Sequence, residues 1–185
     1  RRHIGIVSDD LQERYPRHAL GLDVVLSGFF ASIGTHGLLR ERVTEAQCER
    51  ARRALEAFGV GDMAKQPLSR MSTGQKRRCL LARTMVHEPS TLVLDEPMAG
   101  LDLAAAFDFE SLIGRLSAQG CSIVFVTHHL HEIPPGIERI VLLGGGGIVA
   151  DGPRISVLTR DNLEATYGTR LKLQIIDGRC FVYPA

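Results

Sequence analysis

The sequence lacks several features that would point to common functional classes. It contains no tryptophan, and its four cysteines are widely spaced, at Cys48, Cys79, Cys121 and Cys180. Without a C-x-x-C pair, neither a zinc ribbon nor a dithiol redox motif is expected, and isolated cysteines suit a reducing compartment. No apolar run approaches the roughly 20 residues that span a bilayer. We therefore expect a globular protein that does not itself cross a membrane.

A large net charge of either sign is also lacking. The 22 lysines and arginines are balanced by 21 aspartates and glutamates, which leaves a formal charge of +1. Nucleic-acid binding usually requires a strong basic excess or patch, so no direct nucleic-acid partner is expected. The 185 residues suit one domain, and an apolar content of 44% can supply its core.

The third absence concerns phosphate binding. The only lysines are Lys65, Lys76 and Lys172, and none of them follows a glycine. The phosphate loop G-x-x-x-x-G-K-[ST] is therefore missing. The chain also begins without methionine, at Arg1-Arg2-His3-Ile4, apparently inside a strand. We expect these residues to be part of a longer domain.

The N-terminal third of the chain is predicted to be mainly helical. A short apolar run predicts a strand over 4–7, and the polar stretch 8–17 predicts a loop. Mixed apolar and glycine residues over 18–40 indicate helical pieces. Helical character is thus expected across most of the region between 9 and 70.

One helix in this region has clear boundaries. Thr44 and Gln47 form a capping box, in which each side chain can bond the backbone of the other. Apolar residues follow at helical spacing, and Gly59, with its conformational freedom, is the expected stop signal. The pattern predicts an amphipathic helix over 45–58.

The pattern then alternates between helices and strands. Helices are predicted over 73–87 and 103–119, and strands over 91–95, 121–126, 138–143 and 147–150. Because the strands are apolar without alternation, we predict a parallel sheet covered on both faces. At the C-terminus, 171–176 and 179–183 flank Asp177-Gly178, a dipeptide that favours a type I′ hairpin turn.

The segment Met71-Ser72-Thr73-Gly74-Gln75 lies at a predicted helix start. One interpretation is a second capping box, formed by Ser72 and Gln75. The other is an anion site, because unpaired amides and the helix dipole attract a phosphate and Gly74 lets it approach the backbone. The following Lys76-Arg77-Arg78 would add positive charge.

The run Leu92-Val93-Leu94-Asp95-Glu96-Pro97 places two carboxylates at the end of a buried strand. Ligand sites in parallel sheets lie at this edge. Asp95 could hold Mg²⁺ through its water shell, and Glu96 could then act as general base toward a water. The alternative is an ordinary strand that ends in an acidic turn.

Two further segments carry candidate residues. Asp102, in Ala99-Gly100-Leu101-Asp102, is a candidate N-cap of the next helix, and the family resemblance given below implies a subunit contact there as well. Val126-Thr127-His128 ends the next predicted strand, and His129 and His131 follow. A zinc site on the three histidines is conceivable, but residues this close in a loop rarely supply a complete tetrahedral set.

Together these segments resemble the motifs of an ATP-binding cassette (ABC) transporter nucleotide-binding domain. Met71–Gln75 is similar to its LSGGQ signature, with Met71 for Leu and Thr73 for the first Gly. Leu92–Pro97 resembles Walker B, 99–102 the D-loop, and His128 the switch histidine. The Q-loop pattern places glutamine where Asp9 stands, and Gln12 is the nearest candidate.

The resemblance implies an α/β, RecA-like P-loop NTPase core of mostly parallel strands, with an inserted helical subdomain and no N-terminal Walker A segment. Loss of the helix after Walker A would leave apolar sheet surface bare. The implied parts are 4–8 as core strand and Q-loop start, 9–75 as helical subdomain, 76–150 as RecA-like core, and 151–185 as C-terminal helix and β-hairpin.

The resemblance also implies a function. The complete protein would bind ATP with Mg²⁺ and hydrolyse it, with Glu96 and His128 as catalytic residues and Asp95 at the metal. Ser72, Gly74, Gln75, Gln12 and Asp102 would contribute to the nucleotide site of a homodimer or heterodimer. Hydrolysis would drive a transmembrane permease, with the subunit in the cytoplasm on the inner face of the membrane.

Two alternatives remain open at the level of sequence. One is a soluble ABC-type ATPase that acts on ribosomes or nucleic acid. The other is a binding-only module that lacks Walker A, against which the presence of Glu96 and His128 argues.

Overall fold

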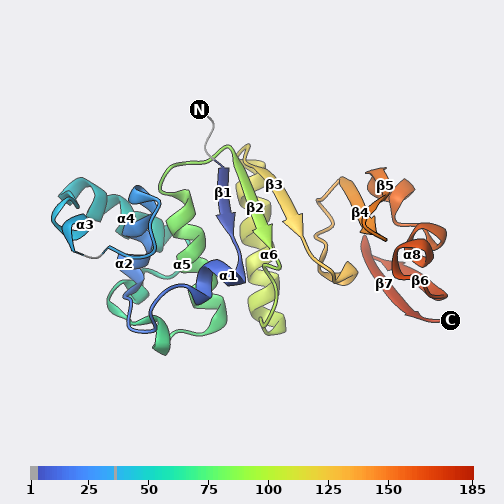
Figure 1. The fold of residues 1–185 in the computed structure, drawn as a ribbon, viewed down its shortest axis with the longest axis horizontal. Helices are drawn as coiled ribbons and strands as arrows, with labels where there is room; N and C mark the ends of the chain where they lie inside the picture. Colours follow the sequence, from blue (N-terminus) through green and yellow to red (C-terminus); the bar gives the residue numbers. More distant parts are fainter. Residues whose placement is uncertain (1–3, 36) are drawn as a thin grey trace. The chain divides into compact units, whose positions relative to one another are not determined.

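The computed structural model describes residues 4–35 and 37–185 (Figure 1). Residues 1–3, where the sequence was expected to open inside a strand, lie outside this description. The chain divides into two compact units, an N-terminal unit that ends at Val126 and a C-terminal unit that begins at Thr127. None of the helices in the described ranges combines the length and the apolarity that crossing a bilayer would demand.

The N-terminal unit is built on a parallel sheet of three strands. Strand β2 (Thr91–Asp95) lies in the centre, between β1 (Ile4–Val7) and β3 (Ser122–Val126). The register aligns Val7 with Leu94, and Asp95 with Val126, so the carboxyl ends of the strands share one edge. The strands predicted over 4–7, 91–95 and 121–126 are confirmed as a parallel sheet, whereas those predicted over 138–143 and 147–150 pair antiparallel in a separate sheet.

A helical insertion separates β1 from β2. Its helices are α1 (Asp9–Glu13), α2 (Gly21–Leu26), α3 (Leu38–Glu41), α4 (Glu45–Ala57) and α5 (Thr73–Met85), with 3-10 turns at Ser27–Phe30, Gly61–Lys65 and Leu68–Arg70. Helix α6 (Leu103–Ala118) connects β2 to β3. The predicted helices and the mainly helical region between 9 and 70 are confirmed.

The predicted loop over 8–17 is wrong at its start, where α1 forms. Ser8 caps this helix, because its side chain accepts a hydrogen bond from the amide of Leu11 at 3.2 Å. Asp9 and Asp10 lie in the first turn, where negative charge is stabilised by the helix dipole. The polar composition of this segment therefore specifies a helix start.

The boundaries of α4 follow from its caps. The hydroxyl of Thr44 accepts from the amide of Gln47 at 3.2 Å, and the Gln47 side chain accepts from the Thr44 amide at 2.9 Å. Gly59 follows the helix with φ +68°, a left-handed conformation that glycine adopts without strain. The predicted capping box and stop are both confirmed.

Helix α5 packs closely on β1 because Gly5 has no side chain. A Cβ at Gly5 would lie 2.2 Å from Cγ2 of Thr84, so any larger residue would push the helix away. The hydroxyl of Thr84 donates to the carbonyl of Leu80 at 2.9 Å. The core beneath α5 and α6 includes Leu92 and Leu94, both fully buried. Figure 1 shows α6 behind the three strands.

The opposite face of this sheet is bare, so the prediction of a sheet covered on both faces is wrong for the described residues. Ile4 is 64% exposed and Ile6 54%, while Val124 and Val126 are each close to half exposed. No helix of the described residues packs over them. The bare apolar surface expected from the resemblance is thus confirmed.

The C-terminal unit contains two hairpins and two short helices. Strands β4 (Arg139–Gly144) and β5 (Gly147–Pro153) pair antiparallel, as do β6 (Leu171–Ile176) and β7 (Arg179–Pro184). The helices are α7 (Arg154–Val157) and α8 (Arg160–Tyr167), and a 3-10 turn covers Leu130–Glu132.

The turn between β6 and β7 follows the prediction from sequence. Asp177 and Gly178 have φ values of +49° and +75°, as a type I′ turn requires at its two central residues. The core of this unit gathers around Leu163, which is fully buried. The predicted hairpin is confirmed.

Candidate functional site

The signature-like segment forms the N-terminus of α5. Ser72 is the N-cap: its hydroxyl accepts from the Gln75 amide at 3.2 Å, and the Gln75 side chain accepts from the Ser72 amide at 2.9 Å. The capping-box interpretation is therefore confirmed. The amides of Thr73 and Gly74 have no acceptor among the described residues. These two N–H groups stay available at the positive end of the helix.

The basic run after the signature does not form a charged surface. Arg77 is fully buried, and Arg78 bonds Asp108 at 3.0 Å. Sequence reasoning counted both as added charge and missed their partners. The missed signal is helical spacing, because Arg77 lies on the same face as the buried Leu80, Leu81 and Thr84.

Arg77 donates hydrogen bonds to three residues in two segments of the N-terminal unit. Its Nη1 donates to the carbonyl of Glu96 at 2.7 Å, and its Nη2 donates to the carboxylate of Asp9 and to the carbonyl of Ala99, the latter at 3.3 Å. Burial lowers the pKa of Arg77, and the charge of Asp9 opposes this change. Arg77 therefore joins α5, α1 and the turn after β2.

The two carboxylates at the end of β2 differ in surroundings. Asp95 is exposed, and its side chain has no hydrogen-bond or ion-pair partner among the described residues. Glu96 has φ +47°, in the left-handed region that residues with a side chain rarely adopt. Its amide donates to the carbonyl of Val126 at 2.9 Å, and its carbonyl also accepts from the Ala99 amide at 3.2 Å. The backbone of Glu96 is thus held on both sides.

Asp102 is the N-cap of α6. Its Oδ1 accepts from the amide of Ala105 at 2.8 Å. The capping interpretation is confirmed, and the subunit contact stays a prediction. The signature segment and the start of α6 lie close together, because a Cβ added at Gly74 would be 3.4 Å from Cβ of Ala105.

Gln12 lies in α1, just beyond the carboxyl end of β1. Its Oε1 is buried and has no partner among the described residues. It lines a hollow of about 540 Å³ together with Glu13, Tyr15, Arg17, Leu68, Ser69 and Lys76. Asp9, which occupies the position of the Q-loop glutamine in the resemblance, is instead bound by Arg77. The role of Gln12 stays a prediction.

His128 belongs to the C-terminal unit, where it is exposed. Its ring stacks near that of His129, with 3.8 Å between ring centroids, and Tyr167 Oη donates to its carbonyl at 3.5 Å. The neighbouring Thr127 donates to Glu132 at 2.9 Å. No cluster of metal-ligating residues occurs in the described ranges, so the three histidines give no support to a zinc site.

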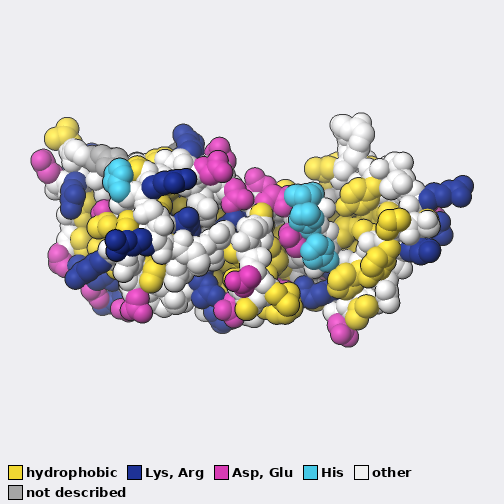
Figure 2. Space-filling view, turned by 90° about the horizontal axis from the view of Figure 1, so that it is seen from below, with side chains coloured by type: hydrophobic (Ala, Val, Ile, Leu, Met, Phe, Trp, Pro, Cys, Tyr) yellow, Lys and Arg dark blue, Asp and Glu magenta, His cyan; other side chains and the backbone are white. Residues whose placement is uncertain are grey.

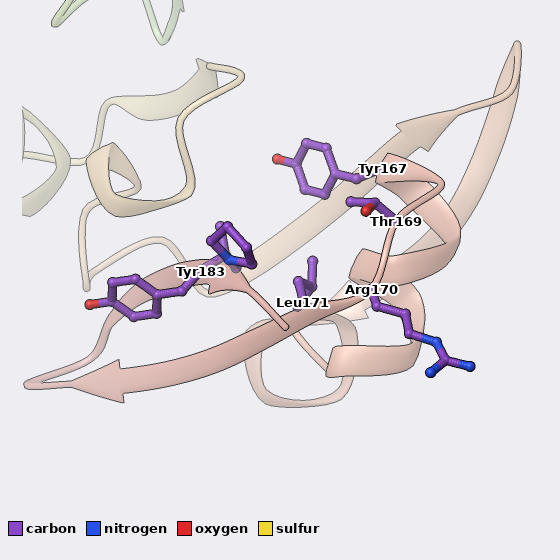
Figure 3. A pocket seen from close by; sticks show the side chains of 7 residues that line it. Tyr167, Thr169, Arg170, Leu171 and Tyr183 are labelled. Carbon is purple, nitrogen blue, oxygen red and sulfur yellow. The ribbon is translucent and has the colours of Figure 1, made fainter.

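The C-terminal unit also has an apolar surface that sequence reasoning did not single out. Figure 2 shows hydrophobic side chains gathered on this unit, and the exposed ones include Ile175, Ile176 and Tyr183. A hollow of about 360 Å³ lies between the end of α8 and the ends of β6 and β7 (Figure 3). None of the predicted site residues lines it.

Comparison with known proteins decides the family. A family model described as ABC transporter matches residues 1–99. YlmA of Bacillus subtilis, an uncharacterized ABC transporter ATP-binding protein, is 36% identical over 185 residues, which cover 98% of this chain and 68% of YlmA. The chain belongs to the ABC transporter family. Another ABC relative, the manganese transport system ATP-binding protein MntB of Bacillus subtilis, is 37% identical over 81% of this chain and 58% of its own length.

A solved structure confirms the fold of this ABC protein. The chain matches a candidate metal-chelate type ABC transporter, captured in an inward-facing conformation, with a TM-score of 0.76 and 25% identity. The match covers 97% of this chain and 70% of that chain. The RecA-like P-loop fold is thereby confirmed, and the ABC relatives identify the chain with the ATP-binding subunit of a transporter. ATP is the ligand that this family binds.

Proposed function

We propose that this chain carries the hydrolytic half of an ATP site and that its complete subunit hydrolyses ATP to drive a membrane permease. The supporting observation is the pair Asp95 and Glu96, side by side at the carboxyl end of the central strand. Asp95 has an unengaged carboxylate, and the backbone of Glu96 is fixed by hydrogen bonds on both sides. Such an arrangement suits a metal ligand beside a general base.

Mg²⁺ fits the free carboxylate of Asp95. Magnesium is commonly held by one or two carboxylates, by waters and by substrate phosphates, so a dedicated cage of protein ligands is not needed. When bound with ATP, Mg²⁺ would neutralise charge that develops on the phosphates.

Glu96 is the proposed general base. Its carboxylate would orient the attacking water and accept its proton as the terminal phosphoryl group is transferred. His128 would contact that phosphoryl group from the segment after β3. Gln12 would face the same site from α1. The chain thus supplies positioning, which dominates phosphoryl-transfer catalysis.

The start of α5 is proposed to meet the ATP of a second subunit. The free amides of Thr73 and Gly74, with the hydroxyl of Ser72, would bind its phosphates, and Gln75 would order the same turn. Asp102 would lie at the contact between the two subunits. The partner is a second copy in a homodimer or a related subunit in a heterodimer.

The phosphate loop of this site must come from polypeptide outside these residues, since none of the three lysines follows a glycine. The amides and lysine of that loop supply most of a phosphate cradle. We therefore expect the 185 residues alone to be inactive and to bind MgATP weakly. Low-micromolar affinity in calorimetric titration of this chain would contradict that expectation.

The hollow beside Gln12 is the proposed docking place for the permease. It combines the buried Leu68 with two basic side chains, Arg17 and Lys76, and so could receive an amphipathic segment with acidic residues. A subunit bound there would lie in the cytoplasm, on the inner face of the membrane. Because MntB is named for manganese, a divalent metal ion or its chelate is the first cargo to test.

The experiment is reconstitution of the complete subunit with its permease in lipid vesicles. We expect ATP hydrolysis that requires Mg²⁺ and is stimulated by the permease, together with cargo movement. An Arg17→Glu variant should lose stimulation while the subunit alone keeps its basal turnover. Hydrolysis stimulated by ribosomes, with no response to any permease, would refute the transport function.

A further inference from the structure

Arg77 is a buried side chain whose contacts reach three candidate motifs. Among the fully buried side chains of the described residues, that of Arg77 has the largest volume, although a guanidinium is always charged. Its acceptors are the carboxylate of Asp9, the carbonyl of Glu96 and the carbonyl of Ala99. The side chain therefore joins the signature helix to the segments that follow β1 and β2.

Stability alone gives a poor account of this arginine. Burying a charge is costly unless it is paired and fully hydrogen-bonded, and well-packed apolar residues often replace a buried ion pair without loss. Here Nε of Arg77 has no partner among the described residues, and the side chain of Asp9 is 46% exposed. The pairing is incomplete on both sides, so the ion pair itself is a weak source of stability.

The contact with Glu96 has a specific geometric consequence. The left-handed φ of +47° at Glu96 is costly for a residue with a side chain and persists only where the surroundings enforce it. The carbonyl of Glu96 accepts from Nη1 of Arg77 at 2.7 Å and from the Ala99 amide at 3.2 Å. Arg77 thus fixes the peptide plane that follows Glu96, and with it the direction of the Glu96 side chain.

We propose that Arg77 is a positioning residue for ATP hydrolysis, acting through Glu96. The proposal rests on the proposed role of Glu96 as general base. Arg77 lies in the second turn of the helix that Ser72 caps. When a phosphate engages the start of α5, Arg77 transmits the position of that helix to Glu96 and Asp9. Hydrolysis is thereby tied to engagement of the signature segment.

The test uses the complete ATP-binding subunit assembled with its permease. Arg77→Met keeps much of the side-chain volume and removes all three hydrogen bonds. We expect kcat for ATP to fall by about 100-fold, since small misplacement of a catalytic group has effects of this order. KM should change little, because Arg77 is fully buried and its hydrogen bonds go to Asp9, Glu96 and Ala99. Arg77→Lys keeps the charge but not the fork of donors, and should recover part of kcat.

The matched control is Arg83→Met in the same helix. Arg83 also donates two hydrogen bonds, one to the hydroxyl of Ser27 and one to the carbonyl of Ser32. Neither acceptor is shared with Arg77. We expect its kcat to stay near that of the unmodified protein. If Arg83→Met lowers kcat as much as Arg77→Met, the effect is general destabilisation and the proposal fails.

A double-mutant cycle separates this proposal from the function beneath it. If Arg77 acts through Glu96, adding Arg77→Met to Glu96→Gln should produce no further loss of the residual turnover. Independent, multiplying losses would overturn the positioning role while leaving Glu96 as base. Unchanged turnover in Glu96→Gln alone would instead refute the proposed function.

The test does not depend on Arg77→Met being able to fold. If Arg77→Met does not fold, Arg77→Lys and Asp9→Asn decide the outcome, because both retain a polar contact in place. Each should lower kcat at unchanged KM. If both keep the kcat of the unmodified protein, Arg77 has no positioning role.

Discussion

Nη1 of Arg77 lies 2.7 Å from the carbonyl oxygen of Glu96, a residue 19 positions later in the chain. This hydrogen bond links the helix that starts at the signature segment to the carboxylate proposed to activate water. The link is carried by a buried side chain, and the same side chain binds Asp9. Arg77 therefore connects the helix that would bind phosphate at its start to Glu96, the proposed general base.

This connection should also contribute to stability. Arg77→Met leaves the carbonyls of Glu96 and Ala99 short of a donor, so we expect the free energy of unfolding to fall by about 1–3 kcal/mol. Arg78→Met removes only an exposed pair with Asp108 and should cost less than about 1 kcal/mol. Urea unfolding of the two variants measures the difference. Equal losses would contradict the buried network.

Cys79 offers a test of the core beneath α5. Burial raises the pKa of its thiol to about 12, whereas an unfolded thiol titrates near 8.5. The folded state therefore holds the proton more tightly, and the stability from this group is complete below about pH 8.5 and is lost as the pH rises toward 12. At pH 9, iodoacetamide should label the partly exposed Cys48 and spare Cys79 until the protein unfolds. Rapid labelling of native Cys79 would show that α5 packs differently.

The bare face of the sheet should govern the solution behaviour of this chain. Ile6 and Val124 are exposed neighbours on β1 and β3, flanking Val93, and contiguous exposed apolar patches promote association. Replacing both Ile6 and Val124 with threonine should reduce aggregation measured by light scattering, with little change in the unfolding midpoint. Leu94→Thr, on the covered face, should lower the midpoint markedly. No effect of the double replacement on scattering would exclude this face as the cause.

Ser72 is predicted to govern ATP-driven dimerisation of the complete subunit. Ser72→Arg would place a long side chain where the phosphate of the second subunit's ATP approaches, so the dimer seen by size exclusion should be lost. Thr44→Arg is the matched control, because Thr44 forms the same kind of capping box at α4. It should cost similar stability, about 1 kcal/mol, without affecting dimerisation. An ATP-dependent dimer in Ser72→Arg would rule out this role.

Much of the fold could be predicted from the sequence because its elements carry strong local signals. The capping boxes at Thr44 and Ser72 and the turn at Asp177-Gly178 are set by neighbouring residues. The short helix α1 was missed because the composition of residues 8–17 is that of a loop, while the cap by Ser8 decides the structure. The bare sheet face depends on which segments cover it, and strand composition does not contain that information.

The candidate site divides in the same way. Asp95 and Glu96 are found from sequence because they follow a buried apolar strand. The role of Arg77 was not found, because it depends on contacts with Asp9, Glu96 and Ala99, which are distant in sequence. Only the helical spacing of Arg77 with Leu80 and Thr84 signals its burial.

The most direct test of the account is ATP turnover by the Glu96→Gln variant of the complete subunit, measured together with ATP binding. The amide keeps the shape of the side chain but cannot accept the proton of the attacking water. We predict that kcat falls by roughly 100- to 10,000-fold while the affinity for MgATP is retained. A kcat equal to that of the unmodified protein would show that Glu96 is not the base and would contradict the proposed mechanism.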